Sequence, residues 1–404
     1  MQDPGYRISY TKYEIRLGLD LRFVNPWRMH LRALLREPRR ATPAANFATL
    51  VAMHAPAIAL RPLPEPPLLL AYQGVAPALR APVARAGAGA AILGRVTLGV
   101  RAVLGRFAVL RGDGHVIEVG DDFHLGAHST VHIAHDLYGT HVGDRVAVGA
   151  NAVVHACTVG DDCVIEDDVA VLDGSVVGAG SVVARGSVVF PRRQLPPGQW
   201  CAGVPAVPLR PVTAAERDRL QARLRAPAAA APAEAAELTL APGTDGYVAA
   251  TVTGRGTLAL GAGSSLWFGC VVAAAGPGIE IAAGANVQDN SILRTSERAL
   301  VVGPESIVGH NVQLHDCTLG ARVLVGMESV LASGTLVQDD VLIAAGSTTT
   351  PGQLLEGGWL WGGRPARPLA RLSESKRALI QLSAAVYRDY ATAFAAAEAA
   401  ALGR

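Results

Sequence analysis

The sequence predicts an all-β solenoid of two parallel β-helices, each followed by an α-helix, with an N-terminal extension. Three observations predict this class: a six-residue aliphatic period, its repetition in the second half of the chain, and a glycine-rich, aromatic-poor composition. The first series is Val159, Ile165, Val171, Val177 and Val183, and the second is Leu319, Val325, Leu331, Val337 and Ile343. A six-residue period with one aliphatic side chain per unit is typical of a β-helix.

Each six-residue unit supplies one short strand and one turn, and three units make one coil of a triangular prism. A single coil cannot bury its own apolar face, so coils must stack. The 44 glycines and the aromatic content of 5% suit tight coils with a narrow interior. The alternative is an ordinary β-sandwich with regularly spaced turns, but two long matching series with a period of six are hard to obtain in that fold.

The 404 residues divide into four predicted segments. Residues 1–67 form an N-terminal arm, 68–225 a front β-helix plus helix, 226–236 an Ala/Pro linker, and 237–404 a rear β-helix plus C-terminal helix. The helices are expected at about 213–225 and 373–398, the second with an apolar face that includes Leu379, Leu382, Val386 and Tyr387. In the arm, residues 26–36 are compatible with a short basic amphipathic helix, either solvated or docked on a partner or membrane surface.

Composition excludes several classes of function. A formal net charge of +2 provides no global field for nucleic acid. The five cysteines form no CxxC pair and no disulfide framework, which favours a reducing compartment. The N-terminal segment carries charges throughout and lacks a secretory apolar stretch, and no uninterrupted apolar run is long enough to suggest a transmembrane span. We therefore expect a cytoplasmic protein, which is compatible with peripheral association with a membrane complex.

One polar motif occurs in both halves, and each copy lacks a different part. Residues 148–160 recur as 308–320, where the rear copy has His310 and His315 five apart. The front copy has Ala150 at the position of His310 but keeps His155, and it carries His132 upstream. Neither copy alone offers three matched histidines, whereas the two together do. Three histidines are one ligand set of a catalytic zinc.

These motifs resemble those of the γ-class carbonic anhydrases, and the resemblance extends over both halves of the chain. The front copy matches the family motifs at Arg111-Gly112-Asp113, His132 and His155, and departs from them at Gly126-Ala127 and Ala150. The rear copy matches at Asn286-Val287-Gln288-Asp289, His310 and His315-Asp316-Cys317, and departs at Ala273-Ala274-Ala275 and Arg294. The resemblance implies a left-handed β-helix. It also implies a metal site between neighbouring barrels, with the upstream and last histidines from one barrel and the middle one from the next.

Transferred residue by residue, the resemblance implies one composite site. His132 and His155 come from the front barrel and His310 from a rear barrel that faces it. Two front barrels offer Ala150 as the third group, and two rear barrels bring Arg294, whose fixed charge opposes a cation. The alternative is that both sites have decayed. The sequence leaves open whether the interface lies within one chain or between chains.

The resemblance further implies zinc, with iron or cobalt as substitutes, and the hydration of carbon dioxide to bicarbonate. Gln288 is expected to orient the nucleophile or substrate, and Arg111, Asp113 and Asp289 are expected to form an ion network across the interface. The acidic proton shuttle of some family members is absent. The candidates to replace it are His115, His135 and His141, and a separate metal cluster at His124, His128, His132 and His135 is a weaker possibility.

Two other functions remain open. One is a non-catalytic, carbonic-anhydrase-like subunit of a larger assembly such as a respiratory complex, which suits the basic arm and the split motifs. The other is an acyltransferase that uses coenzyme A, although no long inserted loop with a catalytic histidine supports it. The resemblance also implies a ring of three barrels. The two barrels of one chain do not fill such a ring, so we expect either a homo-oligomer or a hetero-assembly with other barrels of this kind.

Overall fold

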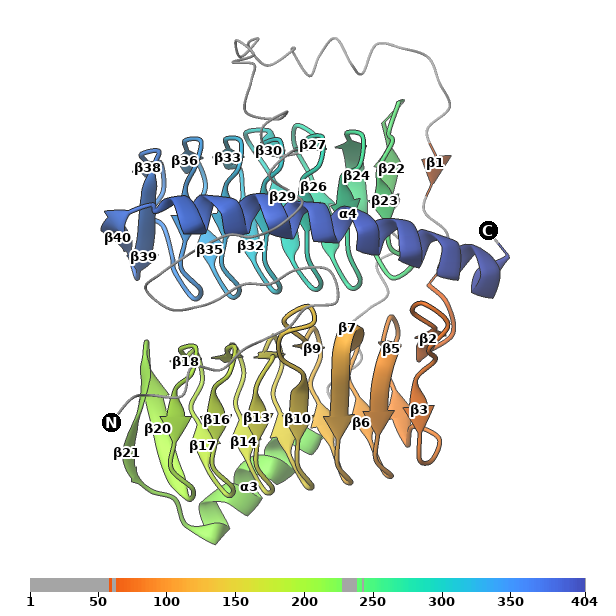
Figure 1. Ribbon diagram of the computed structural model, residues 1–404, viewed down its shortest axis with the longest axis vertical. Helices are drawn as coiled ribbons and strands as arrows, with labels where there is room; N and C mark the ends of the chain where they lie inside the picture. Colours follow the sequence, from red (N-terminus) through yellow and green to blue (C-terminus); the bar gives the residue numbers. More distant parts are fainter. Residues whose placement is uncertain (1–57, 60–62, 227–237, 242, 404) are drawn as a thin grey trace, which may run out of the picture. The chain divides into compact units, whose positions relative to one another are not determined.

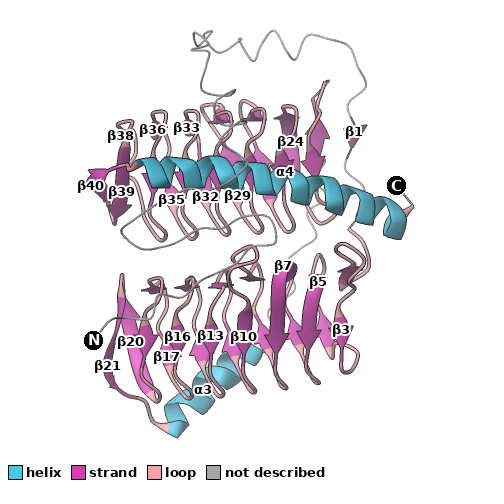
Figure 2. Ribbon diagram, viewed as in Figure 1, coloured by secondary structure: helices cyan, strands magenta, loops and turns pink. Residues whose placement is uncertain are grey.

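The fold was obtained as a computed structural model that describes residues 58–59, 63–226, 238–241 and 243–403 (Figure 1). Strands follow one another as short parallel steps, which confirms the predicted β-helical class and shows that the β-sandwich alternative is wrong. Antiparallel pairing among the named strands is confined to β1 (Ile58–Ala59) with β22 (Leu238–Leu240) and to the hairpin that ends each β-helix, at residues 199–211 and 359–371. Figure 2 shows how few helices accompany the strands.

The front β-helix has two sheets that together enclose a prism. The larger sheet contains β2 (Leu68–Leu70), β3 (Ala78–Leu79), β5 (Ala91–Leu98), β7 (Val109–Val119), β9 (Thr130–His132), β10 (Thr140–Val142), β12 (Val153–His155), β13 (Thr158–Val159), β15 (Ala170–Val171), β16 (Val176–Val177), β18 (Val188–Val189) and β19 (Gln194–Leu195). The smaller contains β4 (Arg85–Ala86), β6 (Val103–Leu104), β8 (His124–Leu125), β11 (Ala147–Val148), β14 (Val164–Ile165), β17 (Val182–Val183), β20 (Gln199–Gly203) and β21 (Ala206–Pro211).

The rear β-helix repeats this plan. Its larger sheet contains β22 (Leu238–Leu240), β24 (Thr253–Leu260), β26 (Val271–Ala274), β27 (Ile279–Ile281), β29 (Ile292–Thr295), β30 (Leu300–Val302), β32 (Gln313–His315), β33 (Thr318–Leu319), β35 (Val330–Leu331), β36 (Leu336–Val337) and β38 (Leu354–Leu355). The smaller contains β23 (Tyr247–Val248), β25 (Ser265–Leu266), β28 (Asn286–Val287), β31 (Ile307–Val308), β34 (Leu324–Val325), β37 (Leu342–Ile343), β39 (Trp359–Gly363) and β40 (Ala366–Arg371).

The aliphatic series forms the interior of both prisms. Val159 pairs with Val177, which lies one full coil of three six-residue units further along, and Val177 pairs with Leu195. These side chains are at most 3% exposed. Stacking them removes apolar surface from water, which stabilises the fold by roughly 25 cal/mol per Å² buried. The period of six therefore fixes both the strand spacing and the core.

Each β-helix is followed by a helix. Helix α3 (Ala214–Arg225) begins with a capping box, in which the Thr213 hydroxyl accepts from the backbone of Glu216 and the Glu216 side chain returns the contact. Helix α4 (Glu374–Leu402) begins at the N-cap Ser373 and ends at Gly403, a glycine in the left-handed conformation at φ 64°.

The predicted apolar face of the C-terminal helix was partly wrong. The buried positions of α4 include Ile380, Ala384, Tyr387 and Phe394, a stripe with spacings of three, four and seven. Tyr387 belongs to it and Val386 packs at its edge, but Leu379 is 51% exposed and Leu382 is 37% exposed. The helix is rich in alanine, so its sequence allows more than one apolar face. Packing against the rear strands selects the face that contains Phe394.

Residues 55–404 form one compact unit in which the two β-helices contact each other. Ala170 and Val188 of the front barrel pack with Met327 and Ala345 of the rear barrel. Polar contacts lie beside this apolar patch: the Thr130 hydroxyl donates to Asn311 Oδ1 at 2.9 Å. Helix α4 contacts strands of both barrels, including β2 and β25. The front–rear interface therefore lies within a single chain.

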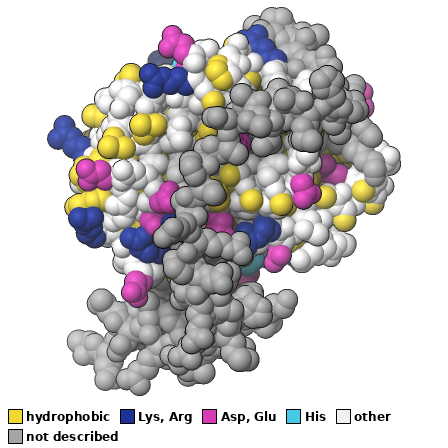
Figure 3. Space-filling view, turned by 90° about the horizontal axis from the view of Figure 1, so that it is seen from above, with side chains coloured by type: hydrophobic (Ala, Val, Ile, Leu, Met, Phe, Trp, Pro, Cys, Tyr) yellow, Lys and Arg dark blue, Asp and Glu magenta, His cyan; other side chains and the backbone are white. Residues whose placement is uncertain are grey.

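Several expectations fall outside the described residues. These include the basic segment 26–36, nearly all of the arm, and the linker from residue 227 to 236. In the described part, no helix is long and apolar enough to cross a membrane. All five cysteines lie in described segments, where each is buried and unpaired. Figure 3 shows basic and acidic side chains interspersed on one face of the described surface.

Candidate metal centre

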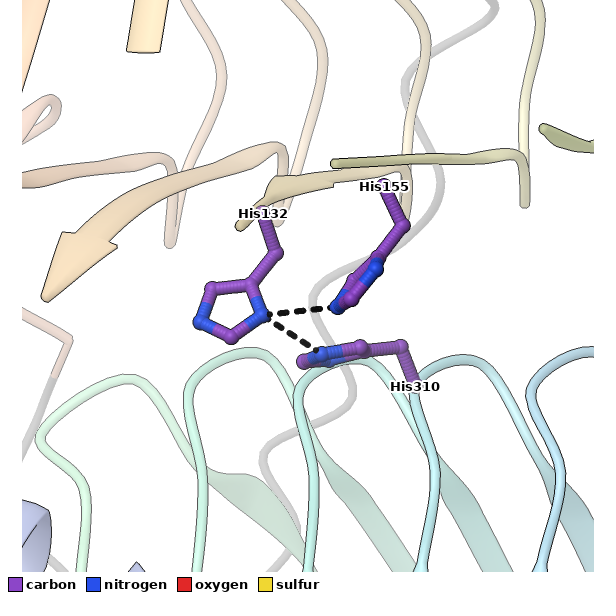
Figure 4. A group of neighbouring side chains, drawn as sticks. All are labelled: His132, His155 and His310. Atoms are coloured by element: carbon purple, nitrogen blue, oxygen red, sulfur yellow. Dashed lines mark hydrogen bonds between the residues drawn. The ribbon is translucent and has the colours of Figure 1, made fainter. Parts of the chain in front are cut away.

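Three histidines from the two β-helices meet at their interface (Figure 4). His132 ends strand β9 and His155 ends strand β12, and the two residues are register partners in neighbouring parallel strands. Their side chains therefore leave the same face of the front sheet, one coil apart. His310 approaches from the rear barrel, from the turn between β31 and β32. The repeat brings this position to the interface because the turns of successive coils stack.

The facing nitrogens of these rings are close enough to share one ion. His132 Nδ1 lies 3.2 Å from His155 Nε2 and 3.1 Å from His310 Nε2. The three candidate ligand atoms all lie within 4.8 Å of one another, and all three residues are buried. Zinc–nitrogen bonds of 2.0–2.1 Å at tetrahedral angles place two ligand nitrogens about 3.3 Å apart. The observed separations therefore fit a metal centre.

Each ring has a carboxylate behind it. Asp113 Oδ1 lies 3.0 Å from His132 Nε2, and Asp173 Oδ1 lies 2.6 Å from His155 Nδ1. Asp289 Oδ2 lies 3.1 Å from His310 Nδ1, which is within ion-pair distance, but the angle between the two groups is not that of a hydrogen bond. A carboxylate favours a proton on the nitrogen it faces, which leaves the lone pair on the other nitrogen. All three lone pairs then point into the space between the rings.

One buried guanidinium joins two of these carboxylates. Arg111 Nη2 lies 2.8 Å from Asp289 Oδ2, and Arg111 Nη1 donates to Asp113 Oδ2. All three side chains are fully buried. The guanidinium also donates to the Tyr387 hydroxyl at 3.2 Å and lies 4.5 Å from the centre of the Trp267 ring. The expected ion network is therefore present, and it links the front barrel, the rear barrel and α4.

Burial keeps His132 and His310 neutral. It lowers the pKa of His132 well below 6.5, and the positive charge of Arg111 adds to the effect. Burial also lowers the pKa of His310 to about 4, although Asp289 acts in the opposite direction. For Asp289, burial opposes ionisation, but Arg111 and His310 outweigh it and bring the pKa to about 2. Neutral imidazole is the form that binds a metal ion.

The other predicted residues make contacts outside this cluster. The Gln288 amide donates to Asn286 Oδ1 at 3.4 Å, so its role in orienting a substrate remains a prediction. His315 is 46% exposed and contacts Ser296 Oγ at 3.2 Å, with Arg294 as its register neighbour. His315 is therefore not a member of the buried set.

The three shuttle candidates have different surroundings. His115 Nδ1 accepts from the backbone N–H of Val116 at 2.8 Å, and the exposed His141 pairs with Glu118 at 3.0 Å. His135 is 40% exposed and contacts the Tyr390 hydroxyl of α4 at 2.5 Å.

The separate four-histidine cluster does not form. Within the described residues, the grouping of metal-binding side chains that contains His132 includes only His155 and His310. The His128 ring packs on Phe107 with 4.8 Å between ring centres. His124 is buried, and burial lowers its pKa to about 4. These rings leave different turns and strands of the prism, so nearness in sequence does not bring them together.

Sequence reasoning missed Asp173. Its signal was available in the spacing, because it follows His155 by three six-residue units, which make one coil. A residue one coil further along lies directly beside its predecessor in the stack. Partial burial opposes ionisation of Asp173, but the neighbouring His155 ring outweighs it and lowers the pKa of this carboxyl.

Known proteins resemble parts of this chain. The family model "Hexapeptide repeat of succinyl-transferase" matches residues 116–156, 139–171 and 316–351. Gamma carbonic anhydrase 1, mitochondrial, from Arabidopsis thaliana is 32% identical over 162 residues, which cover 38% of this chain and 59% of that protein. Protein YrdA from Escherichia coli K12 is 36% identical over 117 residues, covering 27% and 64%. The chain thus spans about three fifths of the length of these curated relatives.

A solved structure gives a further likeness. The crystal structure of a hexapeptide transferase family protein from Anaplasma phagocytophilum is 29% identical and has a TM-score of 0.36, covering 39% of this chain and 92% of that one. The matched repeats and the stacked parallel coils define the class as a hexapeptide-repeat β-helix protein. Within that class, the chain repeats its β-helical unit in tandem and is similar to mitochondrial gamma carbonic anhydrases of Arabidopsis thaliana at 29–32% identity.

Proposed function

We propose that this protein is a zinc-dependent carbonic anhydrase with one composite site per chain, which hydrates carbon dioxide to bicarbonate. The observation that carries the proposal is the buried triad of His132, His155 and His310, in which His132 Nδ1 lies 3.1–3.2 Å from the facing nitrogens of the other two rings and a carboxylate lies behind each ring. Three convergent lone pairs repel one another unless a cation or a proton lies between them. The donor set of three neutral imidazoles fits zinc, with iron or cobalt as substitutes.

A zinc ion held by His132, His155 and His310 would lower the pKa of bound water to about 7 and would thereby supply a nucleophile for a small electrophile such as carbon dioxide. The chain's own residues prepare this chemistry. Asp113, Asp173 and Asp289 face the outer ring nitrogens and favour protons there, and Arg111 offsets one of the two negative charges of the buried carboxylates. Gln288, in the rear-barrel turn next to Asp289, is proposed to orient the substrate.

The names of similar proteins support this proposal. Three mitochondrial proteins from Arabidopsis thaliana that match this chain are called gamma carbonic anhydrases. The residues that differ between the two halves add a second argument. The front barrel keeps two histidines and Arg111, and the rear barrel keeps His310 and Asp289; these retained residues meet in the structure. Random loss of motifs would not leave complementary halves.

The test compares His310→Ala with His315→Ala, two histidines of the same repeat. Metal content is measured by mass spectrometry after purification, and carbon dioxide hydration is measured by stopped flow. We expect about one zinc per chain in the parent, loss of zinc and of hydration for His310→Ala, and little change for the exposed His315→Ala. Equal zinc content in all three proteins contradicts the composite site.

Two other outcomes would replace the proposal. A protein that binds no zinc, iron or cobalt and purifies in a stable larger complex is a carbonic-anhydrase-like assembly subunit. A zinc-independent protein that binds acetyl-CoA in calorimetric titration is an acyltransferase. Hydration activity lost by chelation and restored by zinc excludes both outcomes as the main function.

A further inference from the structure

The three carboxylates behind the histidines differ in their contact with solvent. Asp113 and Asp289 are fully buried, and both contact Arg111. The side chain of Asp173 is 40% exposed, whereas the His155 ring that it contacts is 9% exposed. Within the described part of the chain, no arginine or lysine lies within ion-pair distance of Asp173. Asp173 therefore contacts His155 without an arginine partner of the kind that Asp113 and Asp289 have.

The position of Asp173 is set by the stacking of coils. It follows strand β15, which pairs with β12 in register, so it lies beside the end of the strand that carries His155. Its backbone carbonyl accepts from the Arg192 N–H of the next coil at 2.8 Å. The backbone is thus held by the solenoid, and Oδ1 contacts His155 Nδ1 at 2.6 Å.

The proton on His155 decides whether the site can accept a metal ion. With the proton on Nδ1, the ring donates to Asp173, and Nε2 offers a lone pair to the centre. With the proton on Nε2, the same ring can donate to His132 Nδ1, which is only 3.2 Å away. That internal hydrogen bond occupies two of the three ligand nitrogens at once.

We propose that Asp173 is a positioning residue that holds His155 in the metal-ready tautomer and prevents this histidine–histidine hydrogen bond. The inference rests on the proposed function, since it concerns the same metal centre. The duplicated barrel gives a comparison. The counterpart of Asp173 in the rear copy is Ser333, and its hydroxyl donates to Asp316 at 3.2 Å instead of facing a buried histidine. The acidic residue is present in the barrel that supplies two ligands.

The experiment uses the full chain with Asp173→Ala, Asp173→Asn and the control Ser333→Ala. Zinc affinity is measured by competition with a chromophoric chelator, and folding by circular dichroism. Loss of such an outer partner typically weakens metal binding by roughly 10- to 100-fold. We expect a loss in that range for Asp173→Ala, a smaller loss for Asp173→Asn, whose amide oxygen still accepts from Nδ1–H, and no change for Ser333→Ala.

A second readout separates positioning from general damage. Imidazole nitrogen shifts of ¹⁵N-histidine-labelled metal-free protein, assigned with His155→Ala, report which nitrogen carries the proton. We expect Nδ1–H in the parent and a shift toward Nε2–H in Asp173→Ala. Parent protein that binds zinc, together with Asp173→Ala of unchanged affinity and tautomer, overturns this inference alone. Parent protein that binds no zinc overturns the proposed function as well.

Discussion

Replacing Arg111 with methionine tests how far one guanidinium holds the two β-helices together. Methionine keeps most of the volume of the side chain and removes its charge and its donors. Asp113 and Asp289 then stay buried without a cation between them, since both are fully inaccessible in the parent. Breaking a buried ion pair by removing one partner destabilises proteins by about 3–5 kcal/mol. Two carboxylates depend on this one cation, so we expect the upper part of that range.

The assay is thermal unfolding followed by circular dichroism. An unfolding entropy of about 2.1 cal/mol/K per residue over residues 55–404 converts 3–5 kcal/mol into a decrease of about 4–7 °C in Tm. The control is Arg111→Met combined with Asp113→Asn and Asp289→Asn, which removes the stranded charges and should recover part of the loss. A decrease below about 1 °C for Arg111→Met alone would refute the reasoning, because the carboxylates would then need no partner.

Two further predictions concern packing and pH. Phe394→Ala should lower the free energy of unfolding in urea by about 3–5 kcal/mol, because the ring is fully buried against Trp267 and Phe268. The control is Leu379→Ala, which should change stability by less than about 0.5 kcal/mol because Leu379 is 51% exposed. Equal effects of the two substitutions would contradict the assigned face of α4. Burial, and to a lesser extent the charge of Asp168, raises the pKa of Glu328 well above 4.5 in the folded state. Above about pH 4.5 the folded state therefore binds more protons than the unfolded state. Stability is lost as the pH rises through the folded pKa. Glu328→Gln should therefore raise Tm at pH 8 more than at pH 5, and a gain that is the same at both pH values would count against the assignment.

The fold was predictable because its signal is repeated many times. The series through Val159 and Val177 determines strand length, spacing and core at once, and the second series at 319–343 does the same for the rear barrel. No single position decides the predicted fold, so an ambiguous residue in one repeat does not change the prediction. The apolar face of α4 was not predictable in this way, because an alanine-rich helix has several faces of similar hydrophobicity.

The candidate site was partly predictable. The complementary losses in the two copies pointed to His132, His155 and His310, and the structure brings these three together. Contacts across the interface were harder to infer. Glu328 contacts Asn151 of the front barrel at 3.3 Å. This contact was not predicted, because the six-residue period does not indicate which turns of one prism face the other.

Joining both β-helices in one chain changes how the centre depends on protein concentration. In an assembly of separate subunits, dilution pulls apart any site whose ligands come from two chains. Here His132 and His310 are joined covalently through the backbone, so their encounter is intramolecular and has an effective concentration independent of the amount of protein. The fusion also fixes a ratio of one front half to one rear half. The molecule can therefore tolerate unequal halves that would form mostly mismatched pairs if they were made separately.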